Sequence, residues 1–100
     1  MKAVLDGVRV LDFGHFIAGP FCGALLADFG ADVIRVERVQ GANDRQLVPL
    51  TDAPDKDGAM YLQVNRNKRS LALDTGGPEG GAVLTDLVRQ ADVVIANYPD

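Results

Sequence analysis

Residues 8–38 read VRVLDFGHFIAGPFCGALLADFGADVIRVER, and this stretch decides the fold. Its first seven residues are rich in branched apolar side chains and carry two charges, which is typical of a mostly buried strand. A turn, a helix and a second strand follow, and the core of that strand is Val33, Ile34 and Val36. A strand–helix–strand unit places the turn after its first strand at the carboxyl edge of a parallel sheet, where open α/β folds bind their ligands.

Glycine and proline mark the ends of the helix in this unit. Gly19-Pro20 predicts its start, because the missing N–H of proline would have no partner in the first turn. Gly30 fits the left-handed residue that ends many helices. Gly23 inside the helix costs about 1 kcal/mol relative to alanine, which indicates a close approach of the backbone to a neighbour. The apolar spacing predicts a buried stripe made of Phe21, Cys22, Leu25, Leu26 and Phe29.

The rest of the chain repeats this order of elements after a long polar loop. Residues 39–58 show little periodicity, and the loop is long enough to be functional or mobile rather than a plain connector. The elements expected after it are a helical turn at 59–64, a strand at 70–73, a helix that starts at Pro78-Glu79 and a strand at 92–96. The residues expected to be buried are Met60, Tyr61 and Val64 in the helical turn, and Val83, Leu84, Leu87, Val88 and Ala91 on the helix.

Two such units joined by right-handed crossovers predict an α/β fold with a four-stranded parallel sheet. Residues 1–100 are then one domain, because a chain of this length supports one small core. Only two helices are available for four strands, so one face of the sheet should be thinly covered. Parallel sheets are normally covered on both faces. We therefore expect the chain to be a fragment of a longer protein.

The composition argues against several classes of function. With 47% hydrophobic and 24% charged residues the chain resembles an ordinary globular protein, and its net charge of −4 argues against nucleic acid as a partner. The single cysteine, Cys22, cannot form an intrachain disulfide, fits a cytoplasmic location and is expected in the core rather than as a nucleophile. One histidine and one cysteine exclude a zinc site, and no apolar run is long enough to span a membrane.

Two nucleotide-binding patterns fit the first turn poorly. Gly14 and Gly19 have a spacing close to that of a P-loop, but Pro20 stands where the P-loop needs lysine. Glu37 lies where an NAD-binding Rossmann fold has the acid that binds the ribose. The turn GHFIAG, however, has bulky residues where the dinucleotide fingerprint needs glycine. An NAD-binding domain therefore remains an alternative with little support.

Several basic residues lie near the expected carboxyl edge. His15, in the first turn, is either a turn residue bonded to the backbone or an auxiliary group beside the reacting acyl group. Arg38 directly follows the second strand and suits an anionic ligand, as arginine forks do. Arg66, Lys68 and Arg69 either join Arg38 on that ligand or form an ion-paired structural clamp.

Four segments together resemble the family III CoA-transferases, a group that includes formyl-CoA transferase, carnitine CoA-transferase and the α-methylacyl-CoA racemases. The segments are the stretch quoted above, NRNKRSLALD, PEG and ADVVIANYP, in that order. The resemblance covers nearly the whole chain and is weakest in the loop at 39–58. It implies the N-terminal part of a Rossmann-like large domain that binds coenzyme A, in a homodimer whose two chains interlock.

The resemblance also implies the chemistry and the site. In the family's transferases an aspartate forms acyl anhydride and CoA thioester intermediates in turn, and this residue lies beyond Asp100, so the 100-residue chain alone should be inactive. We expect a transferase that moves CoA between an acyl-CoA and a carboxylic acid; the alternatives are a racemase and a non-catalytic interaction module. Two departures are Ile17, where formyl-CoA transferase has glutamine, and Thr75-Gly76, where the family often has lysine.

Main-chain amides and one guanidinium should hold the CoA, and no metal is implied. The CoA-binding positions that carry over are Ile17, Ala18, Arg38, Leu73, Asp74, Thr75, Gly76, Asn97, Tyr98 and Pro99.

Overall fold

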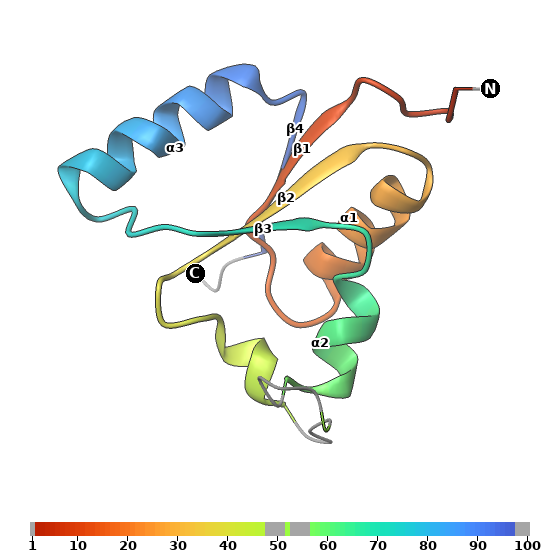
Figure 1. The fold of residues 1–100 in the computed structure, drawn as a ribbon, viewed down its shortest axis with the longest axis horizontal. Helices are drawn as coiled ribbons and strands as arrows, with labels where there is room; N and C mark the ends of the chain where they lie inside the picture. Colours follow the sequence, from red (N-terminus) through yellow and green to blue (C-terminus); the bar gives the residue numbers. More distant parts are fainter. Residues whose placement is uncertain (1, 48–51, 53–56, 98–100) are drawn as a thin grey trace.

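The computed structural model describes residues 2–47, 52 and 57–97, which form one α/β fold around a parallel sheet (Figure 1). The strands are β1 (Arg9–Asp12), β2 (Asp32–Glu37), β3 (Arg69–Ala72) and β4 (Val93–Ile95). The helices are α1 (Ala18–Asp28), α2 (Ala59–Val64) and α3 (Pro78–Gln90), with a short 3-10 helix, η1, at Asn43–Gln46. The expected fold class and the expected order of elements are confirmed.

The four strands are parallel and lie in the order β3-β2-β1-β4. The register pairs Asp12 with Arg35 and with Ile95, and Glu37 with Ala72. The segments that follow the four strands therefore meet at one edge of the sheet. This is the carboxyl edge at which the sequence predicted the ligand.

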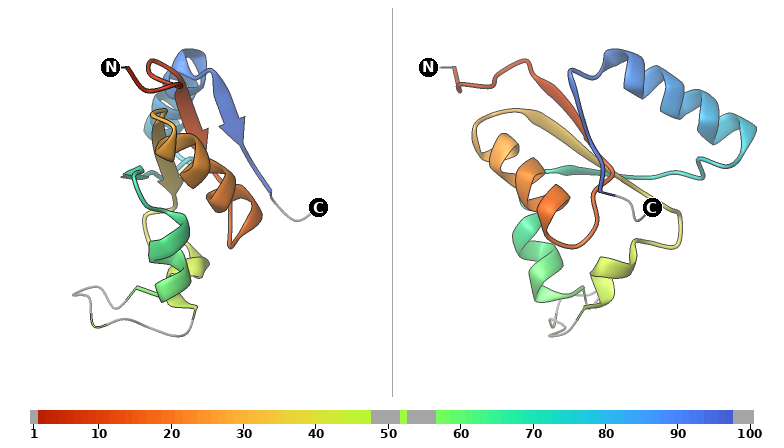
Figure 2. Two further views of the ribbon diagram at one scale, coloured as in Figure 1. Left: turned by 90° about the vertical axis from the view of Figure 1, so that its right-hand side faces the viewer. Right: turned by 180° about the vertical axis from the view of Figure 1, so that it is seen from behind.

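The helices are divided between the two faces of the sheet. The chain crosses from β1 to β2 in one direction and from β3 to β4 in the other, so right-handed crossovers place α1 and α3 on opposite faces. Figure 2 shows α1 lying across the sheet, with α2 beside it and α3 apart from both. The core lies between α1 and the two central strands and centres on Val10, Ala27, Ala31 and Val33.

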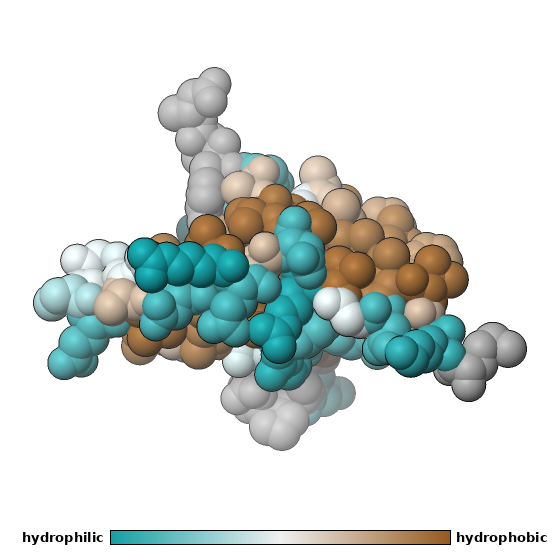
Figure 3. All heavy atoms as spheres, turned by 90° about the horizontal axis from the view of Figure 1, so that it is seen from above, coloured by the Kyte–Doolittle hydropathy of each residue, from teal (hydrophilic) through white to brown (hydrophobic). Residues whose placement is uncertain are grey.

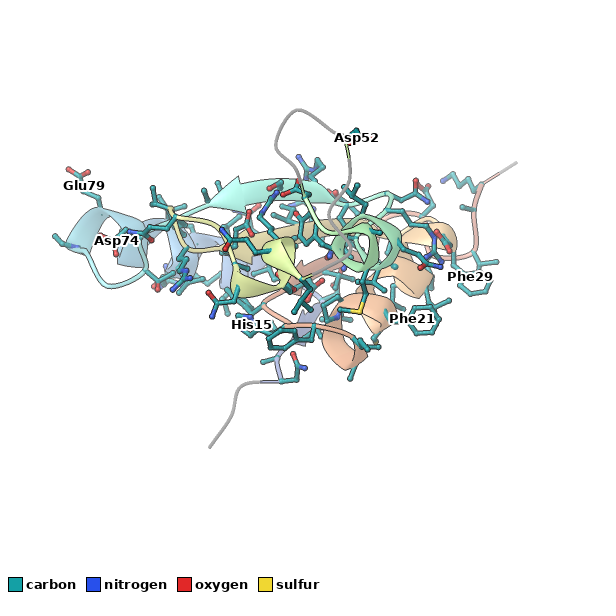
Figure 4. The ribbon with its side chains drawn as sticks, turned by 90° about the horizontal axis from the view of Figure 1, so that it is seen from below. His15, Phe21, Phe29, Asp52, Asp74 and Glu79 are labelled. Atoms are coloured by element: carbon teal, nitrogen blue, oxygen red, sulfur yellow. The ribbon has the colours of Figure 1, made fainter. Side chains whose placement is uncertain are left out.

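Helix α1 faces the sheet with its small residues, and the predicted stripe of large residues is wrong except for Leu26, which is half-buried against the core. Phe21, Leu25 and Phe29 are 44%, 40% and 56% exposed, and Cys22 is exposed as well. Figure 4 shows Phe21 and Phe29 pointing away from the sheet. The physical reason is the close approach of α1 to β1, where a Cβ on Gly23 would lie 2.9 Å from Oδ2 of Asp12. The residues buried instead are Gly19, Pro20, Gly23, Ala24 and Ala27.

The buried stripe predicted on α3 is also wrong. None of the residues of α3 is buried, and Val83 and Val88 are 43% and 45% exposed. Helix α3 packs mainly against β1, and no neighbouring helix covers its flanks in the described part of the chain. This face of the sheet is therefore thinly covered, as the small number of helices predicted.

The element ends agree with the sequence to within one or two residues. Helix α1 begins at Ala18, two residues before Pro20, because any position in the first turn tolerates a missing N–H. Strand β3 begins one residue earlier than expected. Gly30 has the predicted left-handed conformation, with φ +104°. Tyr61 and Val64 are buried as predicted.

Candidate ligand-binding site

A pocket of about 570 Å³ lies at the carboxyl edge of the sheet. The segments after β1, β2 and β3 form its walls. It includes His15 and four of the positions implied by the family resemblance, namely Arg38, Leu73, Asp74 and Thr75. Figure 4 labels His15, from the turn after β1, and Asp74, from the segment after β3. The remaining lining residues are Phe13, Arg35, Val36, Glu37, Val39, Gln40, Ala42 and Asn43.

The other predicted contact residues lie around this pocket or outside the described residues. Ile17 is 56% exposed and caps the start of α1, directly before Ala18. Gly76 lies in the turn before α3, where its N–H donates to Oδ1 of Asp74 at 3.2 Å. Asn97 lies against the turn that carries His15. Tyr98 and Pro99 fall outside the residues that the structure describes.

Arg38 is the predicted cation that lines the pocket. Its Nε donates to the carbonyl of Gly41 at 2.8 Å, and its Nη2 donates to the side chain of Asn43. Among the described residues its Nη1 has no hydrogen-bond partner. The exposed guanidinium is therefore held in place and keeps donors for an anion.

The three other cations form ion pairs, which favours the structural-clamp alternative. Each pairs with an aspartate, and none lines the pocket. The alternative in which they join Arg38 on one ligand is not supported by this geometry. The pairs are Arg66 with Asp28 at 2.6 Å, Lys68 with Asp12 at 2.6 Å and Arg69 with Asp32 at 2.7 Å.

Glu37 is engaged by an arginine and so is not placed to bind a ribose. The Nε and Nη2 of Arg45 both donate to its carboxylate, and the N–H of Ala42 donates to Oε2 at 3.1 Å. Burial raises the pKa of Glu37, but these hydrogen bonds outweigh burial and lower the pKa overall. The guanidinium of Arg45 also lies 4.3 Å from the centre of the Tyr61 ring.

Two buried ion pairs lie next to the turn after β1. The sequence analysis offered an ion pair for Lys68 as one alternative and missed the pair formed by Arg35. Lys68 is 2% exposed and donates from Nζ to Oδ2 of Asp12, to the carbonyl of Pro20 at 2.7 Å and to Asn65 at 2.7 Å. Burial lowers the pKa of Lys68 against the opposing effect of Asp12. The second pair joins Arg35 to Asp44, with both side chains 2% exposed. A signal was present, since Asp12 and Arg35 are charges inside apolar strands.

Side chains hold the backbone of the turn between β1 and α1. The N–H groups of Gly14, His15 and Phe16 donate to Asp12 at 2.7 Å, Asn97 at 2.7 Å and Asp44 at 3.1 Å. These three donors are therefore not available to a phosphate. Main-chain amides that hold the ligand would have to come from other positions. The same geometry argues against an NAD-type turn, which needs such donors for the pyrophosphate.

Neither a metal centre nor a membrane span is found in the described part of the chain. No group of three or more histidine, cysteine, aspartate or glutamate side chains gathers there. No helix within 2–47 and 57–97 has the length and hydrophobicity needed to cross a bilayer.

A parallel sheet with a pocket and a fixed guanidinium at its carboxyl edge defines an open α/β domain with a candidate ligand site at that edge. The comparisons with known proteins narrow this class. The chain belongs to CoA-transferase family III, whose family model matches residues 5–100. The resemblance found in the sequence is therefore confirmed.

Similar proteins of known name include formyl-CoA:oxalate CoA-transferases. The one from Rhodopseudomonas palustris strain TIE-1 is 51% identical over 98 residues, and the one from Bradyrhizobium sp. strain ORS 278 is 48% identical over 98 residues. Each match covers 98% of this chain and 23% of the relative. The chain thus spans about a quarter of the length of these relatives.

Solved structures show the same fold. A CAIB/BAIF family protein from Brucella suis superposes with a TM-score of 0.89 at 38% identity, over 98% of this chain and 26% of that protein. The hypothetical protein Rv3272 of Mycobacterium tuberculosis gives a TM-score of 0.81 at 39% identity, over 93% of this chain and 25% of that protein.

Proposed function

We propose that residues 1–100 are the N-terminal CoA-binding part of a transferase that moves CoA between an acyl-CoA and a carboxylic acid. One observation carries the proposal. Four positions transferred from the family pattern, Arg38, Leu73, Asp74 and Thr75, come from two separate strand ends and line one pocket. Membership of CoA-transferase family III supplies the substrate class.

Arg38 is proposed to bind a phosphate of the nucleotide part of CoA. Its guanidinium is exposed at the pocket, and arginine suits phosphate because its donors match the phosphate oxygens. Asp74 brings a negative charge to the same pocket, so it is proposed to accept a hydrogen bond from a hydroxyl or amino group rather than to approach a phosphate.

The nucleophilic aspartate is proposed to lie outside these residues. Asp12 and Asp44, the two aspartates nearest the turn, are fully buried and ion-paired. Neither can reach a thioester without breaking a buried pair, which would cost about 3–5 kcal/mol. As the family resemblance implies, the carboxylate is proposed to come from the part of the protein beyond residue 100, in a homodimer with interlocked chains.

The acyl groups are proposed to be small carboxylic acids, because the similar transferases are named for formyl-CoA and oxalate. Ile17 stands where the family's formyl-CoA transferase has glutamine, and it faces solvent at the start of α1. The identity of the acid that accepts CoA is therefore left open in this proposal. The test is CoA exchange between formyl-CoA and oxalate or other acids by the native protein. If the protein exchanges the α-proton of a branched acyl-CoA and transfers no CoA, the racemase alternative replaces this proposal.

The binding site is tested with two matched arginine variants of the native protein. Arg38→Ala removes a charge-assisted hydrogen bond of about 1.5–3 kcal/mol, so the KM for acyl-CoA should rise about tenfold or more. Arg66→Ala removes an equal charge outside the pocket and should leave the KM unchanged within about twofold. Equal effects of the two variants would refute a site at Arg38.

A further inference from the structure

We infer that the buried pair Arg35–Asp44 positions the CoA site by holding a strained turn in one conformation. The inference rests on the proposed function only for the identity of the ligand. In this inference Arg35 and Asp44 are positioning residues. They act on the ligand through the main chain of residues 14–16.

The strain lies at Phe16, which has a φ of +63°. A bulky residue in the left-handed region costs about 1–3 kcal/mol and persists only where its surroundings impose it. Asn67 has the same φ, but asparagine tolerates this region and needs no such support. Phe16 is therefore the position in the described chain at which the fold forces an unfavourable backbone conformation on a large side chain.

The ion pair holds the main chain at this position and just before it. Nη2 of Arg35 donates to both carboxylate oxygens of Asp44, at 2.9 and 2.8 Å. Oδ2 of Asp44 also accepts the N–H of Phe16 at 3.1 Å, and Nη1 of Arg35 donates to the carbonyl of Gly14 at 3.0 Å. One buried pair thus fixes a donor and an acceptor two residues apart in the turn.

The same pair joins two walls of the pocket. His15, between the two clamped residues, lines the pocket from the β1 side. Ala42 and Asn43, which directly precede Asp44, line it from the loop after β2. Arg35 itself lines the pocket from β2, so the relative position of the two walls depends on this pair.

The Arg35 guanidinium is oriented so that its Nη groups bond their neighbours while its Nε bonds none. Its Nε is buried and has no partner among the described residues. An unsatisfied buried donor is normally avoided because it loses its hydration. In this orientation Nε loses its hydration, and the two Nη groups donate to Asp44, Gly14 and Asn65.

Replacing the whole pair separates positioning from stability. Well-packed apolar residues can often replace a buried ion pair at little cost in stability. In the native protein, Arg35→Met combined with Asp44→Leu should therefore stay folded but lose the clamp. We expect faster hydrogen exchange in a peptide covering residues 13–18 and CoA binding weaker by about tenfold or more. The control, Arg66→Met with Asp28→Leu, replaces an exposed pair outside the pocket and should change neither quantity.

A rescue experiment covers the case in which the double variant does not fold. Asp44→Asn removes the charge and should weaken CoA binding about tenfold. Adding Phe16→Gly should recover most of that loss, because glycine adopts a positive φ without strain. A purely structural role of Asp44 predicts no recovery.

The outcomes distinguish this inference from the proposed function. Unchanged exchange at 13–18, unchanged CoA affinity in a folded clamp variant, or no rescue by Phe16→Gly overturns the inference. If the unaltered native protein does not bind CoA, the proposed function fails. The exchange measurement, made without ligand, then still decides whether the pair holds the turn.

Discussion

The side-chain amide of Asn97 and the main chain of His15 form a matched pair of hydrogen bonds. Oδ1 of Asn97 accepts the N–H of His15 at 2.7 Å, and Nδ2 donates to its carbonyl at 3.0 Å. The segment after β4 is thus tied to the turn after β1. A Cβ on Gly19 would lie 2.8 Å from Oδ1 of Asn97, so glycine at this position leaves room for the amide.

Asn97→Asp keeps the shape of this side chain but replaces the donor with an acceptor. Two oxygens then face each other across the former bond to His15, and the turn must move. We expect CoA affinity to fall about tenfold, from the loss of about 1–3 kcal/mol for an unsatisfied polar group. Calorimetric titration of the native protein measures this. Asn67→Asp, at an exposed asparagine that bonds only Asp28, is the control and should bind CoA normally.

Gly23→Ala tests the close contact between α1 and β1. Helix propensity alone predicts a gain of about 1 kcal/mol. The new Cβ, however, would lie 2.9 Å from Asp12 and 3.1 Å from Lys68, so we expect a net loss of about 1–3 kcal/mol and a lower Tm. Gly81→Ala on α3 has nothing within 3.9 Å and should raise the Tm slightly. A higher Tm for Gly23→Ala would contradict the packing described here.

Glu37→Gln tests the engaged carboxylate through pH. The pKa of Glu37 is lowered from 4.5 in the folded chain, so its stabilising contribution is complete above pH 4.5 and is lost as the pH falls through the folded-state value. The variant should lose about 1–3 kcal/mol at pH 7. The Tm difference from the unaltered protein should shrink toward pH 3. A difference that stays constant from pH 7 to pH 3 would rule out this role, and Glu79→Gln, exposed on α3, is the control.

The outer face of α1 carries Phe21, Leu25 and Phe29, all at least 40% exposed. Figure 3 shows hydrophobic residues gathered on one side of the surface. Large exposed apolar patches mark contact surfaces. We expect the rest of the native protein to cover this face. Cys22, exposed on the same helix, should react with a maleimide in isolated residues 1–100 and be protected in the native protein. Equal labelling rates would contradict the prediction.

The sequence predicted the fold through local signals that the structure confirms. Gly30 ended α1, Pro78 opened α3, and the apolar run at Val33–Val36 formed the central strand β2. The face of α1 was wrongly predicted because periodicity marked two apolar faces, one large and one small. Only the distance between α1 and β1, which is a tertiary property, selects the small face.

The site was predicted in part, for a similar reason. Arg38 was predicted from its place after a strand, whereas Leu73 and Asp74 were carried over from the family resemblance. All three follow strand ends and line one pocket. The pairing of Arg35 with Asp44 depends on where the loop after β2 folds back, and no periodic pattern encodes that return. A charge within an apolar strand, as at Arg35, is the signal that can reveal such a buried partner.

Calorimetric titration of the native protein with CoA and, separately, with NAD tests the central claim most directly. A CoA site at the carboxyl edge predicts that CoA binds and that Arg38→Ala weakens its binding about tenfold, with no comparable binding of NAD. Tighter binding of NAD than of CoA would contradict the account.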